Sequence, residues 1–562
     1  MAHYERYTGR SRDDFATLAE LMQNYTLTYG EDFNFAYDVL DVMGTEEPEK
    51  LAMLWVGSKG EEKRITFGDM MRRSNQAANV FKSHGIQKGD FVMLVLKRSD
   101  MFWYCMMALH KIGAVAVQAT NMLMTKDYEY RLNAGGIKMA VITGDGDCTE
   151  QLDAGLASYK TLELRAVTKH KDAGEGWIDF ETEMAAASET WERPTGDQAT
   201  KASDMMLMSF SSGTTGYPKM VAHDYTYALA HITTGVFWHR VEDNGLHFTI
   251  SDTGWLKSLW GKMYGQWLGG SAVFTYDFDK FDGADILEKL AKYKVTTFCA
   301  PPTMYRFMLQ NDFSKYDLSA LRHCCTAGEA LSPEIYNEWR KYTGLKIFEG
   351  FGQTETTLSL ATLYPWVQPR LGSMGLPTPG YDTLILDENG KECEPGVTGE
   401  ICIRAHDYET RPRGVFMGYY RNEEATDAQW HDGFYHTGDT AYRDELGFFY
   451  YVGRNDDIIK SSGYRIGPFE VESVMLTHPA VLEVAVTGVP DPVRGFNVKA
   501  TVVLKPGHTP SEALVKELQE HVKTNTAPYK YPRVVEFIAE LPKTISGKVR
   551  RVEIRERDKA AK

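Results

Sequence analysis

The chain has 562 residues, which is too long for one hydrophobic core and predicts two or more domains. Its apolar fraction of 43% and charged fraction of 25% are those of a soluble globular protein, so extensive disorder is excluded. The net charge of −15 argues against a general nucleic-acid binder and against attachment to an anionic membrane. An anionic substrate would therefore need local positive groups.

The seven cysteines are scattered and include no CxxC pair and no zinc-ligand spacing. This pattern predicts reduced thiols in a reducing compartment rather than a disulfide framework. The segment Met1–Arg6 lacks the apolar region of a secretory signal, and no run of about 18 uncharged apolar residues indicates a membrane span. We therefore expect a cytoplasmic protein with no membrane span, and the sequence leaves a homo-oligomer open.

Strand and helix patterns alternate along the first half of the chain. Phe15–Tyr25 has helical spacing, Thr66 with Asp69 predicts the start of another helix, and Gly85 predicts its end. A further helical stretch ends at Ile112. Between these helices lie apolar runs of strand length, at Leu51–Gly57, Phe91–Leu96, Ala114–Gln118 and Met139–Thr143. This alternation predicts βαβ units and a parallel sheet covered on both faces.

The alternation returns after residue 219 and then changes character twice. Expected strands lie at Ser271–Phe274, Thr296–Cys299 and Leu321–Thr326, and helices lie at Ala284–Tyr293 and from Pro302. From Gly372, Pro-Gly and Asn-Gly turns separate short alternating strands, as in a small β subdomain. After Arg454 come strands at Glu483–Val489 and Lys499–Leu504, a helix at Ser511–Val522, and many lysines and arginines.

We therefore predict an α/β fold with two domains. Residues 1–455 would form a large N-terminal domain of two doubly wound α/β subdomains with a small β-barrel subdomain at about residues 372–453. Residues 456–562 would form a small α+β domain. No short-period repeat is visible.

One stretch combines glycines, hydroxyl side chains and a lysine directly after the apolar run 205–208. It reads Ser211, Ser212, Gly213, Thr214, Thr215, Gly216, Tyr217, Pro218 and Lys219. Glycines allow backbone N–H groups to face an anion, and hydroxyls and the lysine add donors and charge. The spacing is not that of a Walker loop, which disfavours a P-loop NTPase. Taken alone, the stretch is equally well explained as a surface turn.

Four later stretches also have residue types suited to a nucleoside triphosphate. Residues 349–355 contain Phe351, which can stack on a base, and Glu355, a hard oxygen ligand for Mg²⁺. In residues 435–439, Asp439 can accept hydrogen bonds from ribose hydroxyls. Residues 453–465 contain Arg454, and residues 541–550 contain Lys548 after a glycine. Each has a simpler explanation alone: Thr354-Glu355 as a helix cap, for example, or Arg454 with Asp457 as a surface ion pair.

Together and in this order, the five stretches resemble the AMP-forming adenylating superfamily of acyl-CoA synthetases, luciferases and peptide-synthetase adenylation domains. The resemblance covers nearly the whole chain from about residue 50. Within the superfamily the chain is most similar to the medium-chain acyl-CoA synthetases, in residues 33–39 (FNFAYDV), 251–255 (SDTGW) and 459–468 (IKSSGYRIGP). The resemblance implies that a carboxylate attacks ATP to give acyl-AMP and pyrophosphate, and that CoA then displaces AMP. No side-chain nucleophile is required, and Cys325 with His323 is interpreted as core packing.

The resemblance also implies a role for each matching residue. Residues 211–219, listed above, would cover the β- and γ-phosphates. The expected catalytic residues are Lys219, Thr354 at the α-phosphate, Glu355 with Mg²⁺, and Lys548 between the α-phosphate and the attacking carboxylate. Asp439 would bind the ribose beside Arg454. The adenine would be framed by Gly328, Glu329, Ala330, Glu349, Gly350 and Phe351, with Gly352 and Gln353 in the same stretch. The family usually has tyrosine at the position of Phe351, so stacking is kept but a hydroxyl hydrogen bond is lost.

The resemblance further implies a mobile C-terminal domain that rotates about Asp456 between the two half-reactions. Lys548 and the CoA-binding face cannot both occupy the entrance of the active site at the same time, which explains the rotation. The expected CoA-binding residues are Ser462, Gly463, Tyr464, Arg465, Arg494, Lys523, Tyr531 and Arg533. A solvated basic face explains Lys523 equally well.

For the acyl pocket we expect Trp238, Trp255, Lys257, Trp260, Cys299 and Gly350. Tryptophans reduce pocket volume, which favours a short, medium-chain, branched or aromatic acid, although Trp is also commonly part of the core.

The predicted activity is therefore that of a carboxylate–CoA ligase that uses ATP, Mg²⁺ and coenzyme A. One alternative keeps adenylation but transfers the acyl group to a carrier-protein thiol or to oxygen; the end of the chain at Lys562, with no carrier domain, disfavours a peptide-synthetase module. A second alternative is a non-catalytic nucleotide or acyl-CoA sensor. That alternative predicts that polar residues are lost from the phosphate sites, whereas all of them are present.

Overall fold

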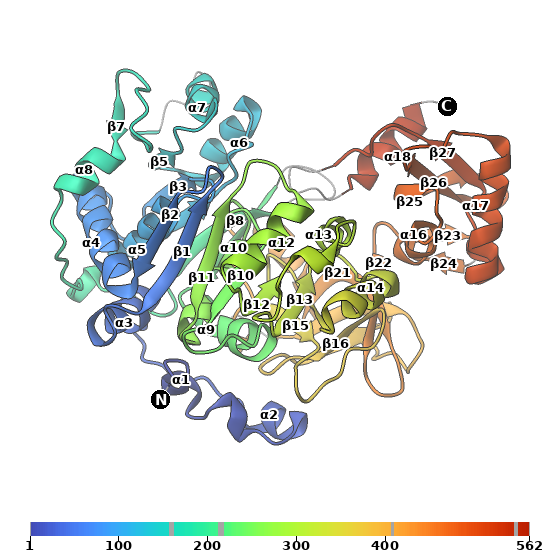
Figure 1. The fold of residues 1–562 in the computed structure, drawn as a ribbon, viewed down its shortest axis with the longest axis horizontal. Coiled ribbons are helices and arrows are strands. Elements are labelled where there is room, and N and C mark those ends of the chain that lie inside the picture. The colour runs from blue at the N-terminus through green and yellow to red at the C-terminus, as the bar shows by residue number, and fades with distance from the viewer. Residues whose placement is uncertain are drawn as a thin grey trace.

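The structure is a computed structural model that describes residues 2–156, 162–211, 218–405, 410–462, 464–543 and 549–560. It has a large N-terminal part built on two sheets and a small C-terminal part beside it (Figure 1). The first sheet has the strand order β17 (Thr383–Leu386), β18 (Gly399–Arg404), β21 (Phe434–Arg443), β22 (Phe449–Arg454), β16 (Ser373–Pro377), β15 (Leu358–Ala361), β14 (Ile347–Gly352), β13 (His323–Ala327), β12 (Thr297–Cys299), β10 (Leu246–Thr249), β11 (Ala272–Asp277), β1 (Leu51–Gly57) and β2 (Glu62–Thr66), with β20 (Trp430–His431) beside β21.

The second sheet has the order β19 (Gly418–Tyr419), β9 (Lys219–Asp224), β8 (Met205–Ser211), β4 (Val115–Gln118), β3 (Phe91–Val95), β5 (Met139–Ile142), β6 (Leu164–Val167) and β7 (Trp177–Asp179). From β8 to β7 its strands pair in parallel, as do those of the first sheet from β14 to β1. These two runs confirm the predicted pair of α/β subdomains.

Helices cover both faces of the two sheets. Successive strand residues face opposite sides of a sheet, so a strand of apolar residues packs on both faces. Val92 and Leu94 of β3 pack in a core between the sheets, whereas Met93 and Val95 pack in a separate outer core. The helices of this part are α1 (Glu5–Thr8), α2 (Leu18–Asn24), α3 (Val42–Glu46), α4 (Phe67–Ser83), α5 (Met101–Ile112), α6 (Thr125–Gly135), α7 (Cys148–Leu156), α8 (Phe180–Ala186), α9 (Thr226–Ile232), α10 (Lys257–Gly261), α11 (Tyr264–Leu268), α12 (Gly283–Lys292), α13 (Pro302–Met308), α14 (Pro333–Thr343) and α15 (Glu423–Asp427).

Local sequence signals explain several of these boundaries. Thr66 and Asp69 form the predicted capping box at the start of α4, and Gly85 has a φ of +76° just after the helix. Every residue of α5 is buried, as expected for a helix that is apolar around its whole circumference and lies in the core between the sheets. All seven cysteines lie in the described ranges, and each is buried and free of a disulfide.

The antiparallel strands β16, β17, β18, β20, β21 and β22 occupy the expected β subdomain. They continue the first sheet, because β16 pairs with β15 and β15 with β14. Because of this continuity, β14, β21 and β22 belong to one sheet. The arrangement positions the candidate active site.

The C-terminal part has its own sheet, ordered β24 (Tyr464–Ile466), β23 (Ile459–Ser461), β26 (Gly495–Leu504) and β25 (Val481–Asp491), with β27 (Val534–Phe537) on β26. One face packs on α16 (Pro468–Leu476) and α17 (Glu512–Asn525), and the other on α18 (Arg551–Ala560). This is the predicted α+β domain. It meets the N-terminal part at β22, where Tyr451 and Phe469 have ring centroids 6.1 Å apart. No helix in the described ranges is long and apolar enough to cross a bilayer.

Candidate active site

The carboxyl ends of the parallel strands β12, β13 and β14 bring several predicted site residues to one edge of the first sheet. Cys299 ends β12, Gly328 follows β13, and Gln353 follows β14. Ala327 lies opposite Gly350, so the 328–330 turn is beside residues 351–353. Ligands of open α/β sheets bind at such edges. Thr354 and Glu355 lie in the turn between β14 and β15 and therefore cap no helix.

Asp439, Arg454 and Gln353 form a network at the junction of β14, β21 and β22. Asp439 lies opposite Arg454 in the β21–β22 pair, with its carboxylate 3.8 Å from Arg454 Nη1. Gln353 Nε2 donates to the Asp439 carboxylate and, at 2.8 Å, to the carbonyl of Thr437. The nearby carboxylates, Asp439 first among them, raise the pKa of Arg454 and outweigh the effect of burial. Arg454 also approaches Asp456 (3.5 Å), rather than forming the surface pair with Asp457 considered above.

Glu355 and Lys219 meet around Tyr419. The Tyr419 hydroxyl donates to Glu355 Oε1 (2.9 Å), and Lys219 Nζ lies 4.5 Å from the centre of the Tyr419 ring. Burial raises the pKa of Glu355, while Lys219 and Arg454 oppose that shift. A partly buried carboxylate of this kind is stabilised by a nearby cation. Glu355 therefore fits the predicted Mg²⁺ ligand.

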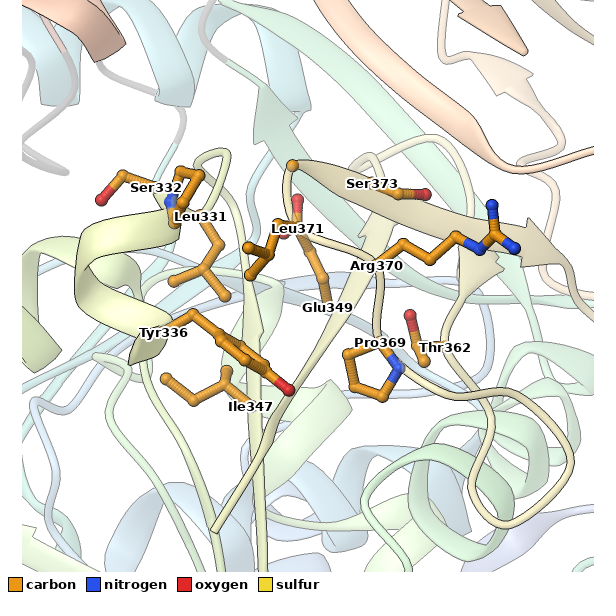
Figure 2. Close-up of a pocket in the computed structure, with 12 residues that line it drawn as sticks. Leu331, Ser332, Tyr336, Ile347, Glu349, Thr362, Pro369, Arg370, Leu371 and Ser373 are labelled. Atoms are coloured by element: carbon orange, nitrogen blue, oxygen red, sulfur yellow. The ribbon is translucent and has the colours of Figure 1, made fainter. Parts of the chain in front are cut away.

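Glu349 lies beneath the 328–331 segment. It is 5% exposed and lines a small pocket (Figure 2), in which its side chain lies between Leu331 and the 369–373 segment. Burial raises its pKa well above the usual value, and a hydrogen bond from the Leu331 backbone opposes the shift only in part. Burial thus favours the neutral form of the Glu349 carboxyl group. Of the residues expected around adenine, Glu329 is exposed, and its carboxylate accepts from the Thr303 hydroxyl (2.6 Å).

Two glycines of β14 allow two tryptophans to pack against the strand. A Cβ added at Gly350 would lie 2.8 Å from the Trp238 ring, and one added at Gly352 would lie 2.5 Å from the Trp260 ring. Lys257 Nζ donates to the carbonyl of Ala327 (2.6 Å), which supplies the partner that a lysine in this position needs. Burial raises the pKa of Cys299, and Lys257 opposes that shift. Trp238, Lys257, Trp260, Cys299 and Gly350 therefore line one region, while Trp255 is half-buried on the turn before α10.

Some predicted residues lie outside the described part of the chain. They are Ser212, Gly213, Thr214, Thr215, Gly216 and Tyr217 of the first loop, Gly463, the side chain of Arg465, and Lys548. The two ends of the first loop are described: Ser211 pairs with Lys219 between β8 and β9. His323 and Cys325 are buried, and both contact the Trp238 carbonyl, at 2.8 Å and 3.2 Å. Their interpretation as core residues is consistent with these contacts.

The residues expected to bind CoA fall into two neighbouring groups. Arg494 Nη1 donates to the Ser462 hydroxyl (3.1 Å), and Tyr464 stacks on Tyr529 with ring centroids 4.0 Å apart. In the second group, Lys523 and Arg533 each place their charged end 4.5 Å from the centre of the Tyr531 ring. Lys523 also pairs with Glu520 (3.2 Å), so it is compatible with a solvated face as well.

Three tyrosines that our sequence analysis did not single out support the network. Tyr419 binds Glu355, the Tyr435 hydroxyl donates to Gln353 Oε1 (2.7 Å), and the Tyr451 hydroxyl donates to Asp439 (3.1 Å). Tyr435 begins the stretch 435–439 that contains Asp439, so its position in the sequence could have indicated a role at the site. Tyr419 and Tyr451 carried no local signal, because their roles depend on strand pairing over long sequence distances.

Comparisons with known proteins agree with this geometry. A family model described as AMP-binding enzyme matches residues 41–420, and one for the AMP-binding enzyme C-terminal domain matches residues 470–548. The mitochondrial acyl-coenzyme A synthetase ACSM3 of Mus musculus is 40% identical over 99% of this chain and 96% of its own length. The mitochondrial acyl-coenzyme A synthetase ACSM5 of Rattus norvegicus is 42% identical over 94% of this chain and 91% of its own.

Two solved structures are similar over almost the whole chain. The anthranilate CoA ligase AuaEII in complex with anthranoyl-AMP has a TM-score of 0.86 at 28% identity, covering 95% of this chain and 98% of that one. The Brucella canis acyl-CoA synthetase has a TM-score of 0.71 at 30% identity, covering 98% and 99%.

The fold, the site and these matches define an adenylate-forming enzyme, and the chain belongs to the AMP-binding enzyme family. More particularly, it is an AMP-forming acyl-CoA synthetase, which joins a carboxylic acid to CoA through an acyl-adenylate and uses ATP, Mg²⁺ and CoA. The prediction of a cytoplasmic location is wrong: the two curated relatives named above, which match nearly the whole chain, are mitochondrial. Reduced cysteines do not distinguish the cytosol from another reducing compartment.

Proposed function

We propose that the acid is compact, namely short or medium-chain, branched or aromatic, rather than a long fatty acid. The observation that supports this is the packing of Trp238 and Trp260 on the two glycines of β14, which fills volume at the strand edge. The similar structures named above include an enzyme that acts on anthranilate. A pocket enclosed by fixed aromatic rings discriminates against extra methylene groups by about 1–3 kcal/mol each.

In the first half-reaction, the Asp439–Arg454–Gln353 network binds the ribose. Asp439 accepts hydrogen bonds from the ribose hydroxyls, Tyr451 and Gln353 hold its carboxylate in place, and Tyr435 holds Gln353. Lys219 and residues 211–218 cover the outer phosphates, and Thr354 contacts the α-phosphate. Glu355 would hold Mg²⁺, which would supply positive charge to the phosphates. Catalysis is thus mainly positioning and charge neutralisation along an in-line displacement.

Lys548 belongs to the C-terminal domain and neutralises the repulsion between the acid's carboxylate and the α-phosphate. For the second half-reaction, that domain turns about Asp456 and presents residues 462–465 with Arg494 and Arg533 to CoA. The position of Asp456 supports this step: it follows the last strand of the N-terminal part, and its carboxylate approaches Arg454. The turning proposal fails if Asp456→Pro slows both half-reactions equally, because a rigid hinge should mainly impair the second.

The experiment that tests the proposed substrate measures AMP release with ATP, Mg²⁺ and CoA over acetate, butyrate, a branched five-carbon acid, benzoate, octanoate and palmitate. We expect kcat/KM to peak among the acids of up to eight carbons and to be at least about tenfold lower for palmitate. A maximum at palmitate would contradict the compact pocket. Omission of free CoA tests the acceptor, because acyl transfer to a carrier-protein thiol needs no free CoA.

A further inference from the structure

Three side chains that can bind a metal ion converge on the strand pair behind Asp439, apart from the proposed Mg²⁺ site at Glu355. Glu400 and Cys402 are two residues apart on β18 and therefore project from the same face. His436 on β21 lies directly opposite Cys402. One donor atom from each of the three lies within 4.8 Å of the other two.

Two separations among these donor atoms are close to those of a tetrahedral zinc site. Cys402 Sγ lies 3.5 Å from His436 Nδ1, and that nitrogen lies 3.2 Å from Glu400 Oε2. In a tetrahedral Zn²⁺ site, with bonds of about 2.3 Å to sulfur and about 2.1 Å to nitrogen or oxygen, the corresponding separations are about 3.6 Å and about 3.4 Å. Two of the three separations are thus close to those of a metal site, and the third, between Cys402 Sγ and the Glu400 carboxylate, is within 4.8 Å.

Hydrogen bonding alone accounts poorly for this cluster. Both Glu400 and Cys402 approach the same ring nitrogen, which carries either a proton or a lone pair and can make one regular hydrogen bond. The other ring nitrogen, Nε2, is buried and has no hydrogen-bond partner among the described residues. A cation between the three donors would satisfy the crowded nitrogen together with the thiolate and the carboxylate.

We propose that Glu400, Cys402 and His436 form a binding site for a divalent transition metal of the Zn²⁺ class, with water as the fourth ligand. A thiolate and an imidazole favour such an ion over Mg²⁺, which prefers oxygen ligands. The side chains of His436 and Glu400 are 16% and 22% exposed, so an ion can enter from solvent. Binding replaces the thiol proton of Cys402, which is released to water.

The site is connected to the proposed ribose-binding turn, so this step rests on the proposed function of Asp439. Glu400 Oε1 accepts a hydrogen bond from the backbone N–H of Gly438 (2.8 Å), the residue before Asp439. Gly438 has a φ of +72°, and a Cβ added there would lie 3.0 Å from Arg454 Nη2. A metal ion bound to Glu400 Oε2 would neutralise part of the carboxylate charge and so weaken the hydrogen bond that Oε1 accepts from Gly438. We therefore expect bound Zn²⁺ to raise KM for ATP.

Metal binding is tested first, on untagged full-length protein without ATP. Equilibrium dialysis should show one tightly bound Zn²⁺ per chain, and Co²⁺ should give a thiolate charge-transfer absorption band. Cys402→Ser should weaken Zn²⁺ binding at least about tenfold and abolish the band. Cys393→Ser removes another buried cysteine of the same subdomain and should retain both. Equal binding and an unchanged band in Cys402→Ser would overturn the site.

A second variant keeps the test decisive if Cys402→Ser proves unstable in thermal unfolding. His436→Gln should likewise lose the tight site, and retention of tight binding in that variant would overturn the proposal.

The link to ATP is measured at fixed, saturating Mg²⁺. Zn²⁺ should raise KM for ATP several-fold in the wild type, a zinc-selective chelator should reverse the effect, and Cys402→Ser should show little of it. Zn²⁺ that binds through Cys402 without changing KM would overturn the link. Failure of the proposed role of Asp439 is a different result, since Asp439→Asn would then leave KM for ATP unchanged in metal-free protein.

Discussion

Asp439 and Arg454 lie directly opposite each other on β21 and β22, with 3.8 Å between the carboxylate and Arg454 Nη1, and Gln353 of the β14–β15 turn binds the same carboxylate. Residues from three separate stretches of sequence thus converge on one buried acid. The carboxylate is already oriented by its neighbours, which limits the cost of ordering it when a ribose binds.

Asp439→Asn should therefore impair ATP binding. The amide is nearly the same shape but loses the charge and half of the acceptor capacity, so kcat/KM for ATP should fall by about 10–100-fold, mainly through KM. Steady-state kinetics with ATP varied will measure this. Asp444→Asn is the matched control, because Asp444 pairs with Arg370 (3.0 Å) at the surface beyond the same strand. A similar loss in both variants would contradict the ribose-binding role.

Glu355→Gln should raise the Mg²⁺ concentration required for half-maximal activity by about tenfold or more, because a neutral amide is a weaker ligand for a hard cation. The measurement is a Mg²⁺ titration at fixed total ATP, with free Mg²⁺ calculated. Glu334→Gln, on the exposed start of α14, should leave the titration unchanged. If Glu355→Gln lowers the maximal rate without shifting the Mg²⁺ midpoint, Glu355 is not the ligand.

Trp238→Leu should widen the acyl pocket and change specificity. The ratio of kcat/KM for octanoate to that for butyrate should increase by about tenfold, because the smaller side chain frees volume beside Gly350. Trp339→Leu makes the same change on the buried face of α14, where Trp339 is 0% exposed. Both variants should lose about 2–4 kcal/mol of stability. If the ratio increased equally in the Trp339 variant, the change in specificity would result from general loosening of the core rather than from a wider acyl pocket.

Glu349→Gln should make stability less dependent on pH. The folded-state pKa of Glu349 lies well above its ordinary value of 4.5, so its contribution to stability is present below pH 4.5 and is lost as pH rises toward the folded-state pKa. Glutamine does not titrate. The unfolding free energy of the variant minus that of the wild type should therefore become more positive from pH 4.5 to pH 8, as measured by urea unfolding. A difference that stays flat or falls over this range would contradict a raised pKa for Glu349.

The sequence predicted the layers of the fold better than the contacts of the site. Strands such as Leu51–Gly57 and the Thr66 capping box depend on nearby residues, and both were predicted correctly. Contacts that depend on long-range pairing were not. Arg454 was considered a partner of Asp457, three residues away, but strand pairing places it opposite Asp439. Asp457 instead pairs with Arg551 (3.7 Å) and Arg555 of α18.

The same reasoning explains why Tyr419 was missed. It lies in the two-residue strand β19, which has no detectable period, and it reaches Glu355 only because β19 pairs with β9. The motif residues themselves could be identified because their chemical types are unusual in combination. Their supporting hydroxyls could not, because a tyrosine in a strand is ordinary.

The central claim is that cations from two domains act on one nucleotide, and Lys548→Ala tests it most directly. The two half-reactions should be measured separately, as acid-dependent ATP–pyrophosphate exchange and as thioester formation from supplied acyl-AMP and CoA. Lys543→Ala is the control, because Lys543 lies in the same segment but pairs with Glu483 (2.6 Å). We predict that Lys548→Ala lowers exchange by roughly 100-fold or more while thioester formation stays within a few-fold of wild type. An equal loss in both half-reactions would contradict the account.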